Sequence, residues 1–138
     1  GVSVSTSYKL GDTVITGITP GTGASSVLAN ISAGSGTVKV LKADGTENTG
    51  AVGTGNKIAV YANGTLVKQY DVVIYGDING DGKISVVDLV MMQKQILGTS
   101  QLSGAYAAAA DISRDGKVSV KDLVLLQKHI INAAQIEQ

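Results

Sequence analysis

The chain has 138 residues, which is enough for one ordinary domain or two small ones. With 11 basic and 11 acidic residues its formal net charge is zero, so the composition does not favour a nucleic-acid-binding surface. Cysteine is absent, which excludes disulfides, thiolate metal sites and a cysteine nucleophile.

No apolar run approaches the roughly 20 residues that a membrane-spanning helix requires, so no membrane association is expected. The first residues lack the basic start and apolar stretch of a signal peptide. A mature secreted protein, or a fragment of a longer one, would have the same appearance.

Residues 1–75 have the patterns of β-strands. Valine alternates with serine over residues 2–5, and Thr37–Lys42 alternates with a period of two. Two further strands are expected around Asn63-Gly64, because this dipeptide accepts the positive φ angles of a tight hairpin turn.

One segment within residues 1–75 has helical spacing instead. Ala24, Val27, Leu28 and Ile31 fall at i, i+3, i+4 and i+7, which is one face of a short helix. We therefore expect a small β-rich α+β module in which one helix lies across a sheet. A β-grasp-like arrangement is favoured, and an immunoglobulin-like sandwich is the alternative.

After Gly76 the sequence becomes helical and acidic. Residues 77–98 and 111–132 are identical at 13 of 22 aligned positions, so this half contains an internal duplication. The boundary between the halves is placed between Tyr75 and Gly76. Because no flexible linker separates them, we expect residues 1–75 to pack rigidly against residues 76–138.

Each repeat begins with the ligand spacing of an EF-hand calcium loop. Calcium takes about six to eight oxygen ligands, which loop positions 1, 3, 5, 7 (by its carbonyl), 9 (through water) and 12 can supply. Glycine at position 6 permits the sharp turn. The predicted ligands are Asp77, Asn79, Asp81, Lys83, Ser85 and Asp88 in the first loop, and Asp111, Ser113, Asp115, Lys117, Ser119 and Asp122 in the second.

The second site is expected to bind calcium more weakly, because the Ser113 side chain is shorter than that of Asn79. An alternative interpretation is that both segments are acidic turns. Ser85 with Asp88, and Ser119 with Asp122, would then be helix capping boxes. Two loops in one register favour calcium, and capping is expected in addition.

Two departures from an ordinary EF-hand point to a family. Position 12 is aspartate in both loops, and the first loop follows the strand-like segment DVVIYG, so each repeat is a loop followed by one helix. With the motif D-x-N-x-D-G-x-I-x-x-x-D-L and its second copy, Gly76 to about Asn132 resembles a dockerin, the all-α calcium-binding module of cellulosome-type assemblies. Residues 1–75 resemble, more loosely, the accessory X modules that precede some dockerins.

The resemblance implies a non-catalytic, calcium-dependent module that binds a cohesin domain on a scaffold protein. Such a module anchors an attached enzyme or adhesin to a secreted, extracellular or cell-surface-attached bacterial complex. Two Ca²⁺ ions, and a chain that is monomeric before it binds cohesin, are implied as well.

In this family, exposed residues at positions 10, 11, 17, 18 and 22 select the cohesin. The wide apolar surface of the two repeat helices also predicts a partner. The expected contact residues are Val86, Val87, Met91, Gln93, Lys94, Val120, Lys121, Leu125, Gln127 and Lys128, with Gly98 and Asn132 at position 22.

Some residues of the repeat helices are expected in the core of the module. Leu89, Val90, Leu123 and Val124 are assigned to it, and Val86 and Val120 could pack there instead of facing a partner. Residues 101–111, with their alanine run, predict a short linking helix.

Other functions are less well supported by the sequence. The single histidine, His129, is expected at the surface, and the carboxylates outside the loops are scattered, so no enzyme is predicted. A carbohydrate- or cell-surface-binding accessory module using Tyr8, Tyr61 or Tyr70 is the alternative function. A calcium sensor would need incoming helices that the repeats lack.

Overall fold

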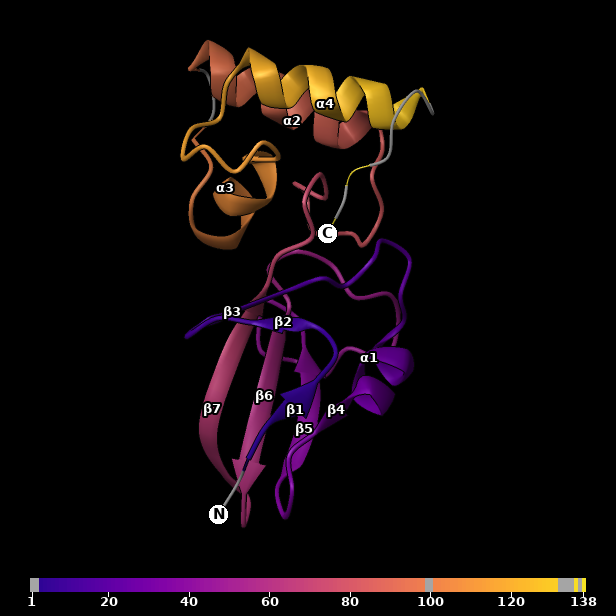
Figure 1. The fold of residues 1–138 in the computed structure, drawn as a ribbon, viewed down its shortest axis with the longest axis vertical. Helices are drawn as coiled ribbons and strands as arrows, with labels where there is room; N and C mark the ends of the chain where they lie inside the picture. Colours follow the sequence, from indigo (N-terminus) through magenta and orange to yellow (C-terminus); the bar gives the residue numbers. More distant parts are fainter. Residues whose placement is uncertain (1–2, 99–100, 132–135, 137) are drawn as a thin grey trace.

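The computed structural model describes residues 3–98, 101–131, 136 and 138. A β-rich part is followed by a helical part, and the two lie at opposite ends of the molecule (Figure 1). The valine expected in a strand at position 2 lies outside the described residues. In chain order the elements are β1 (Ser5–Thr6), β2 (Lys9–Leu10), β3 (Val14–Thr16), α1 (Ala24–Asn30), β4 (Ile31–Ser32), β5 (Thr37–Leu41), β6 (Lys57–Ala62), β7 (Thr65–Val72), α2 (Val86–Leu97), α3 (Gly104–Ala110) and α4 (Val120–Ile130).

The β-rich part is built on a mixed sheet with the strand order β2-β3-β7-β6-β5. Strand β3 runs parallel to β7, and the other neighbours are antiparallel. Between β6 and β7 the chain turns at Asn63 (φ 52°) and Gly64 (φ 80°), so the predicted hairpin is confirmed. Two successive positive φ angles match the twist of the flanking strands.

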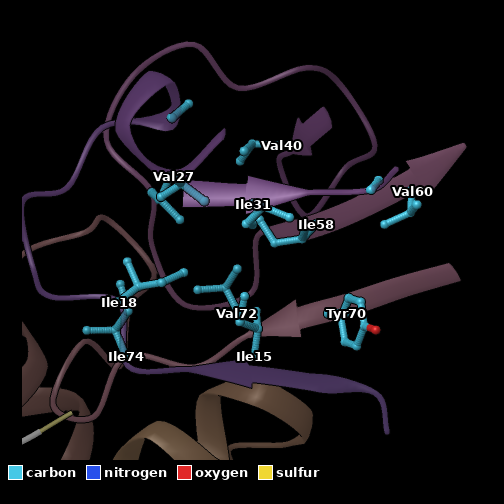
Figure 2. Packing of buried hydrophobic residues seen from close by; sticks show 13 residues of the cluster. Ile15, Ile18, Val27, Ile31, Val40, Ile58, Val60, Tyr70, Val72 and Ile74 are labelled. Atoms are coloured by element: carbon cyan, nitrogen blue, oxygen red, sulfur yellow. The ribbon is translucent and has the colours of Figure 1, made fainter. Parts of the chain in front are cut away.

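The first core lies between the sheet and helix α1. Figure 2 shows Val27 of α1 among side chains from the sheet, including Ile15, Ile58 and Val72, and all four are almost fully buried. The predicted helix is confirmed, although it ends at Asn30 and Ile31 already belongs to β4. Residues spaced for one helical face thus cover the inner face of the sheet.

The helical part has a separate, smaller core. Helices α2 and α4 lie side by side at the end of the molecule away from the sheet (Figure 1). Met92 and Leu126 are fully buried between them and α3, the predicted linking helix. None of the described helices has the length and hydropathy needed to span a bilayer.

One assignment to this core is wrong. Leu89 and Leu123 are partly buried against it, but Val90 and Val124 are 41% and 40% exposed. The buried side of α2 is set by Asp88 and Met92, which are four residues apart. Val90 lies halfway between them in sequence, about 200° around the helix from either, and therefore faces outward.

The β-rich and helical parts meet directly where β7 ends. Two residues after β7, Ile74 is buried in the first core, and Ile78 is buried in the second. The amide of Gly21 donates a hydrogen bond to the Gly82 carbonyl (2.8 Å). At the other side of the junction, Gln138 accepts a hydrogen bond from the Tyr75 amide (2.6 Å) and donates one to the Tyr75 carbonyl (2.9 Å).

Candidate metal centre and interaction face

Three carboxylates of the first loop converge, as their spacing predicts. Asp77 lies five residues after the end of β7, Asp81 lies within the loop, and Asp88 belongs to the first turn of α2. One oxygen atom of each lies within 4.8 Å of the others. Gly82 at position 6 has φ of 83°, and Gly116 of the second loop has φ of 90°, a left-handed conformation that favours glycine.

Asp77 is fully enclosed. Its side chain is 0% exposed, and it accepts hydrogen bonds from the amides of Gly80 (3.2 Å), Gly82 (3.0 Å) and Thr54 (2.9 Å). The Thr54 amide comes from the β-rich part. This carboxylate therefore orders the loop and also contacts the other half of the molecule.

Asp88 ties the beginning of the loop to the helix that follows it. Its carboxylate accepts hydrogen bonds from the amides of Ile78 (2.8 Å) and Asn79 (2.9 Å). It also accepts one from Ser85 (2.8 Å), which forms the predicted capping box. Position 12 thus has both predicted properties, because it lies in the acidic cluster and caps α2.

The buried carboxylates of the first loop are not neutralised by basic side chains. Burial, followed by the charges of Asp88 and Asp81, raises the pKa of Asp77 to about 6. Burial also raises the pKa of Asp88. Among the described residues an ion pair joins Lys57 to Asp71, and none involves the loop carboxylates. A divalent cation would relieve this repulsion, so the residues fit a metal ion.

The second loop repeats this arrangement in a more open setting. Asp111, Asp115 and Asp122 bring carboxylate oxygens within 4.8 Å of one another. Asp122 is fully buried and accepts hydrogen bonds from Ser113 (2.8 Å) and from Ser119 (2.9 Å), the predicted cap of α4. Asp111 is only partly buried.

The second loop also contains a carboxyl group with a lowered pKa and a buried hydroxyl without a partner among the described residues. The Lys117 amide donates a hydrogen bond that holds the pKa of Asp115 below its usual value. The hydroxyl oxygen of Ser113 is buried and has no hydrogen-bond partner among the described residues. An unpartnered oxygen at position 3 suits an ion or a water bound to one.

The remaining predicted ligands lie at the rim of the loops. The Asn79 side-chain oxygen accepts a hydrogen bond from the Asp81 amide (3.1 Å). Lys83 and Lys117 are exposed, as expected where a backbone carbonyl is the predicted ligand. Of the twelve predicted ligand residues, the structure brings together the three carboxylates of each loop, and it does not test the others as ligands.

Helices α2 and α4 carry an exposed apolar surface, which we call the outer face. Its members occupy the same three positions of each repeat: Val86, Val90 and Leu97 on α2, and Val120, Val124 and Ile131 at and just beyond α4. Val86 and Val120 are 59% and 60% exposed, so these two do not pack within the module. The sequence analysis missed the other four, although spacings of four and eleven residues from Val86 and Val120 place them on the same side.

The other predicted contact residues divide into two groups. Val87, Gln93, Lys94, Lys121, Gln127 and Lys128 are exposed. Met91 and Leu125 are partly buried and pack against the second core. Gly98 is exposed, and its counterpart Asn132 lies outside the described residues.

The residues of the rival interpretations lie outside the acidic loops. Tyr70 is buried in the first core and Tyr8 packs against it, so the tyrosines do not form an open platform with Tyr61. His129 is partly buried, not at the surface as expected, and its Nδ1 accepts a hydrogen bond from the Ile136 amide (3.2 Å).

Fold and site together define a class: a duplicated module in which each repeat is an EF-hand-like acidic loop followed by one helix. Residues 75–131 match the family model described as the dockerin type I domain. This part of the chain is a dockerin, which is a non-catalytic assembly module, and dockerins bind calcium. The resemblance found in the sequence is confirmed for this part, and the β-rich part preceding it is also observed.

No curated protein matches the chain. Two solved structures with similarity are complexes of the third ScaC cohesin with the ScaB dockerin from Acetivibrio cellulolyticus, each displaying a type I interaction. In one the dockerin is mutated in its N-terminal helix, with 25% identity, a TM-score of 0.44 and coverage of 47% of this chain and 92% of that chain. In the other the mutation is in the C-terminal helix, with 26% identity, a TM-score of 0.43 and coverage of 47% and 96%.

Proposed function

We propose that the chain is a calcium-dependent assembly module that binds a cohesin domain on a scaffold protein. Residues 76–138 are the dockerin, and residues 1–75 are an accessory, X-like module. The observation that carries this proposal is the duplicated acidic loop: two copies in one register, each gathering three carboxylates, within a segment that matches the dockerin family.

Two calcium ions per chain follow from the two clusters. Each cluster gathers three carboxylates whose oxygen atoms lie within 4.8 Å of one another. In the first loop, the raised pKa of Asp77 records the cost of burying that charge without a cation. The predicted side-chain and carbonyl ligands of both loops complete the coordination, and the ions stabilise a module whose core is small.

The outer face is the proposed contact with cohesin. It presents six exposed apolar side chains on two adjacent helices, bordered by the exposed pairs Gln93-Lys94 and Gln127-Lys128. An apolar surface of this kind on a small module is typical of a protein interface. Calcium acts on this face indirectly, because Asp88 and Asp122 cap the first turns of the two helices that carry the outer face.

The chain so described is part of a secreted, cellulosome-like complex and holds an attached enzyme or adhesin there. It is monomeric before it binds cohesin and has no catalytic activity of its own. For the accessory module, one helix against one face of a mixed sheet supports a β-grasp-like arrangement over the alternative immunoglobulin-like sandwich.

A panel of purified type I and type II cohesins tests this proposal. The immobilised full chain should capture at least one cohesin in millimolar calcium and lose it in EGTA. A variant with Val86→Asp and Val120→Asp should fail to capture it, while Leu66→Asp, at an equally apolar but distant exposed site, should bind normally. If no cohesin of either type is captured in calcium, the proposed function is wrong.

A further inference from the structure

The segment that connects β5 to β6 contacts the first calcium loop. We call residues 51–56 the junction loop. Adding a Cβ atom to Gly53 would place it 2.7 Å from the Gly82 amide nitrogen and closer still to the Gly80 carbonyl. The backbones of the two loops are therefore in direct contact, and only glycine at position 53 permits this approach.

Thr54 connects the junction loop to the beginning of the calcium loop. Its side-chain oxygen accepts a hydrogen bond from the Ile74 amide (3.0 Å) and donates one to the Ile74 carbonyl (3.2 Å). Its own amide donates to Asp77 (2.9 Å). Thr54 is 1% exposed, so all three bonds are shielded from water.

The junction loop is held in shape by its own hydrogen bonds. The Asn56 side-chain oxygen accepts hydrogen bonds from the Gly53 amide (3.2 Å) and from the Asn48 side chain (2.7 Å). Asn48 also donates to the Ala51 carbonyl (2.9 Å). Both asparagines are buried, so the Thr54 amide is presented to Asp77 from a fixed backbone.

The second calcium loop has a different environment at the equivalent position. The hydrogen bonds that Asp111 accepts among the described residues come from Asp115 (3.3 Å) and Gly116 (2.9 Å), both in its own loop. The position-1 carboxylate of the first loop thus has one donor from outside, Thr54, in addition to two from its own loop, whereas the donors to Asp111 among the described residues all belong to its own loop.

We infer that Gly53 and Thr54 are positioning residues of the first calcium site, contributed by the β-rich part. This inference rests on the proposed calcium sites and adds that they are inequivalent. The junction loop fixes the position-1 carboxylate of the first site before an ion arrives, whereas the second site orders its own. Packing of the β-rich part and calcium binding at the first loop therefore support each other.

A calcium titration of the full chain followed by NMR separates the two sites. The amides of Gly82 and Gly116 report them individually, because each donates to the position-1 carboxylate of its loop (3.0 and 2.9 Å). In Gly53→Ala the affinity read at Gly82 should fall at least tenfold, and that at Gly116 should change less than twofold. Gly50→Ala is the matched control, since a Cβ there meets only the Asn48 side chain at 3.7 Å.

A milder variant covers the case in which Gly53→Ala does not fold. Thr54→Val keeps the shape and the amide but removes both hydrogen bonds to Ile74, and should lower the first-site affinity severalfold with the second unchanged. Hydrogen exchange at the amide of Thr54 should quicken, while that of Val60 in the first core stays slow. The inference would be overturned if the folded variants kept the wild-type calcium affinity at Gly82, or if they lost calcium affinity equally at both sites. Either result would leave the proposed function intact. A wild-type chain that takes up no calcium would overturn both.

Discussion

The two acidic loops have nearly the same sequence and different surroundings. Both gather three carboxylates, and both end in a Ser-x-x-Asp cap of the following helix. Yet Asp77 is fully buried beneath the junction loop, whereas Asp111 is partly open to solvent. A local motif therefore determines which carboxylates converge, while the rest of the fold determines how deeply they are buried.

The largest expected effect comes from removing position 1 of each loop in turn. In millimolar calcium, Asp77→Ala should lose one ion and leave the amides of Thr54, Gly80 and Gly82 without an acceptor. At about 1 kcal/mol for each lost hydrogen bond, the free energy of unfolding should fall by about 3 kcal/mol, beyond the loss of the ion. Asp111→Ala should also lose one ion, but it should lower the free energy of unfolding by less. The residues whose amides donate to Asp111, Asp115 and Gly116, are exposed to solvent.

Chemical denaturation with calorimetric ion counting measures both effects. Asp12→Ala, at an exposed carboxylate outside the loops, is the control and should bind two ions with unchanged stability. Equal destabilisation by Asp77→Ala and Asp111→Ala would show that the burial of the first loop has no energetic consequence.

A second prediction concerns pH in the absence of calcium. Because burial raises the pKa of Asp77 from 3.8 to about 6, the folded state holds its proton more tightly than the unfolded state does. In EGTA, stability should therefore fall as pH rises from about 4 to about 6, by about 3 kcal/mol. Asp88, whose pKa is also raised, adds in the same direction.

Thermal melts between about pH 4 and pH 6, once in EGTA and once in calcium, show whether stability falls or rises with pH. Calcium replaces the proton, so the gap between the two melting temperatures should widen as pH rises. Asp77→Asn should remove most of the pH dependence in EGTA. Stability in EGTA that increases with pH through this window would contradict the assignment.

The third prediction tests whether the two halves of the outer face are equivalent in binding. A half-turn about the internal pseudo-twofold axis exchanges Val86 with Val120, but it also exchanges Val87 with Lys121. Burying a lysine side chain in an interface costs binding free energy unless its charge stays solvated. We therefore expect a preferred orientation, in which Lys121 lies at the rim of the interface. Changing Val86 and Val87 to serine should then weaken cohesin binding about tenfold, or about 1.4 kcal/mol.

The matched variant changes Val120 and Lys121 to serine and should weaken binding only two- to threefold, as measured by surface plasmon resonance. The third variant carries all four substitutions, and its cohesin affinity is measured in the same way. Nearly silent single pairs with a damaging combination would mean that both orientations are equally good.

The smallest expected effect lies at position 3 of the loops. Ser113→Asn gives the second loop the amide that the first loop has at Asn79, and should raise the second-site calcium affinity a few-fold. The reciprocal change, Asn79→Ser, should lower the first-site affinity by a similar factor. Amide shifts of Gly116 and Gly82 during calcium titration report the two sites. No change in either variant would indicate that position 3 does not coordinate the ion.

The sequence predicted best what depends on neighbouring residues. The hairpin at Asn63-Gly64, the capping boxes and the convergence of carboxylates from positions 1, 5 and 12 all follow from chemistry within a dozen residues. The match of residues 75–131 to dockerins was recognisable for the same reason.

What the sequence did not show depends on contacts between distant segments. Gly53-Thr54-Gly55 has the composition of an ordinary turn, and its role follows only from its contact with Gly80 and Gly82 of the other half. Val90 was misassigned because it adjoins Leu89 in an apolar run, and composition alone does not show which side of a helix is covered.

The central claim is that calcium organises two loop–helix repeats into one cohesin-binding face. Its most direct test is to titrate a cohesin captured from the panel into the full chain, first in calcium and then in EGTA. We predict one cohesin per chain in calcium, no measurable binding in EGTA, and full recovery when calcium is restored. The same affinity with and without calcium would contradict the claim.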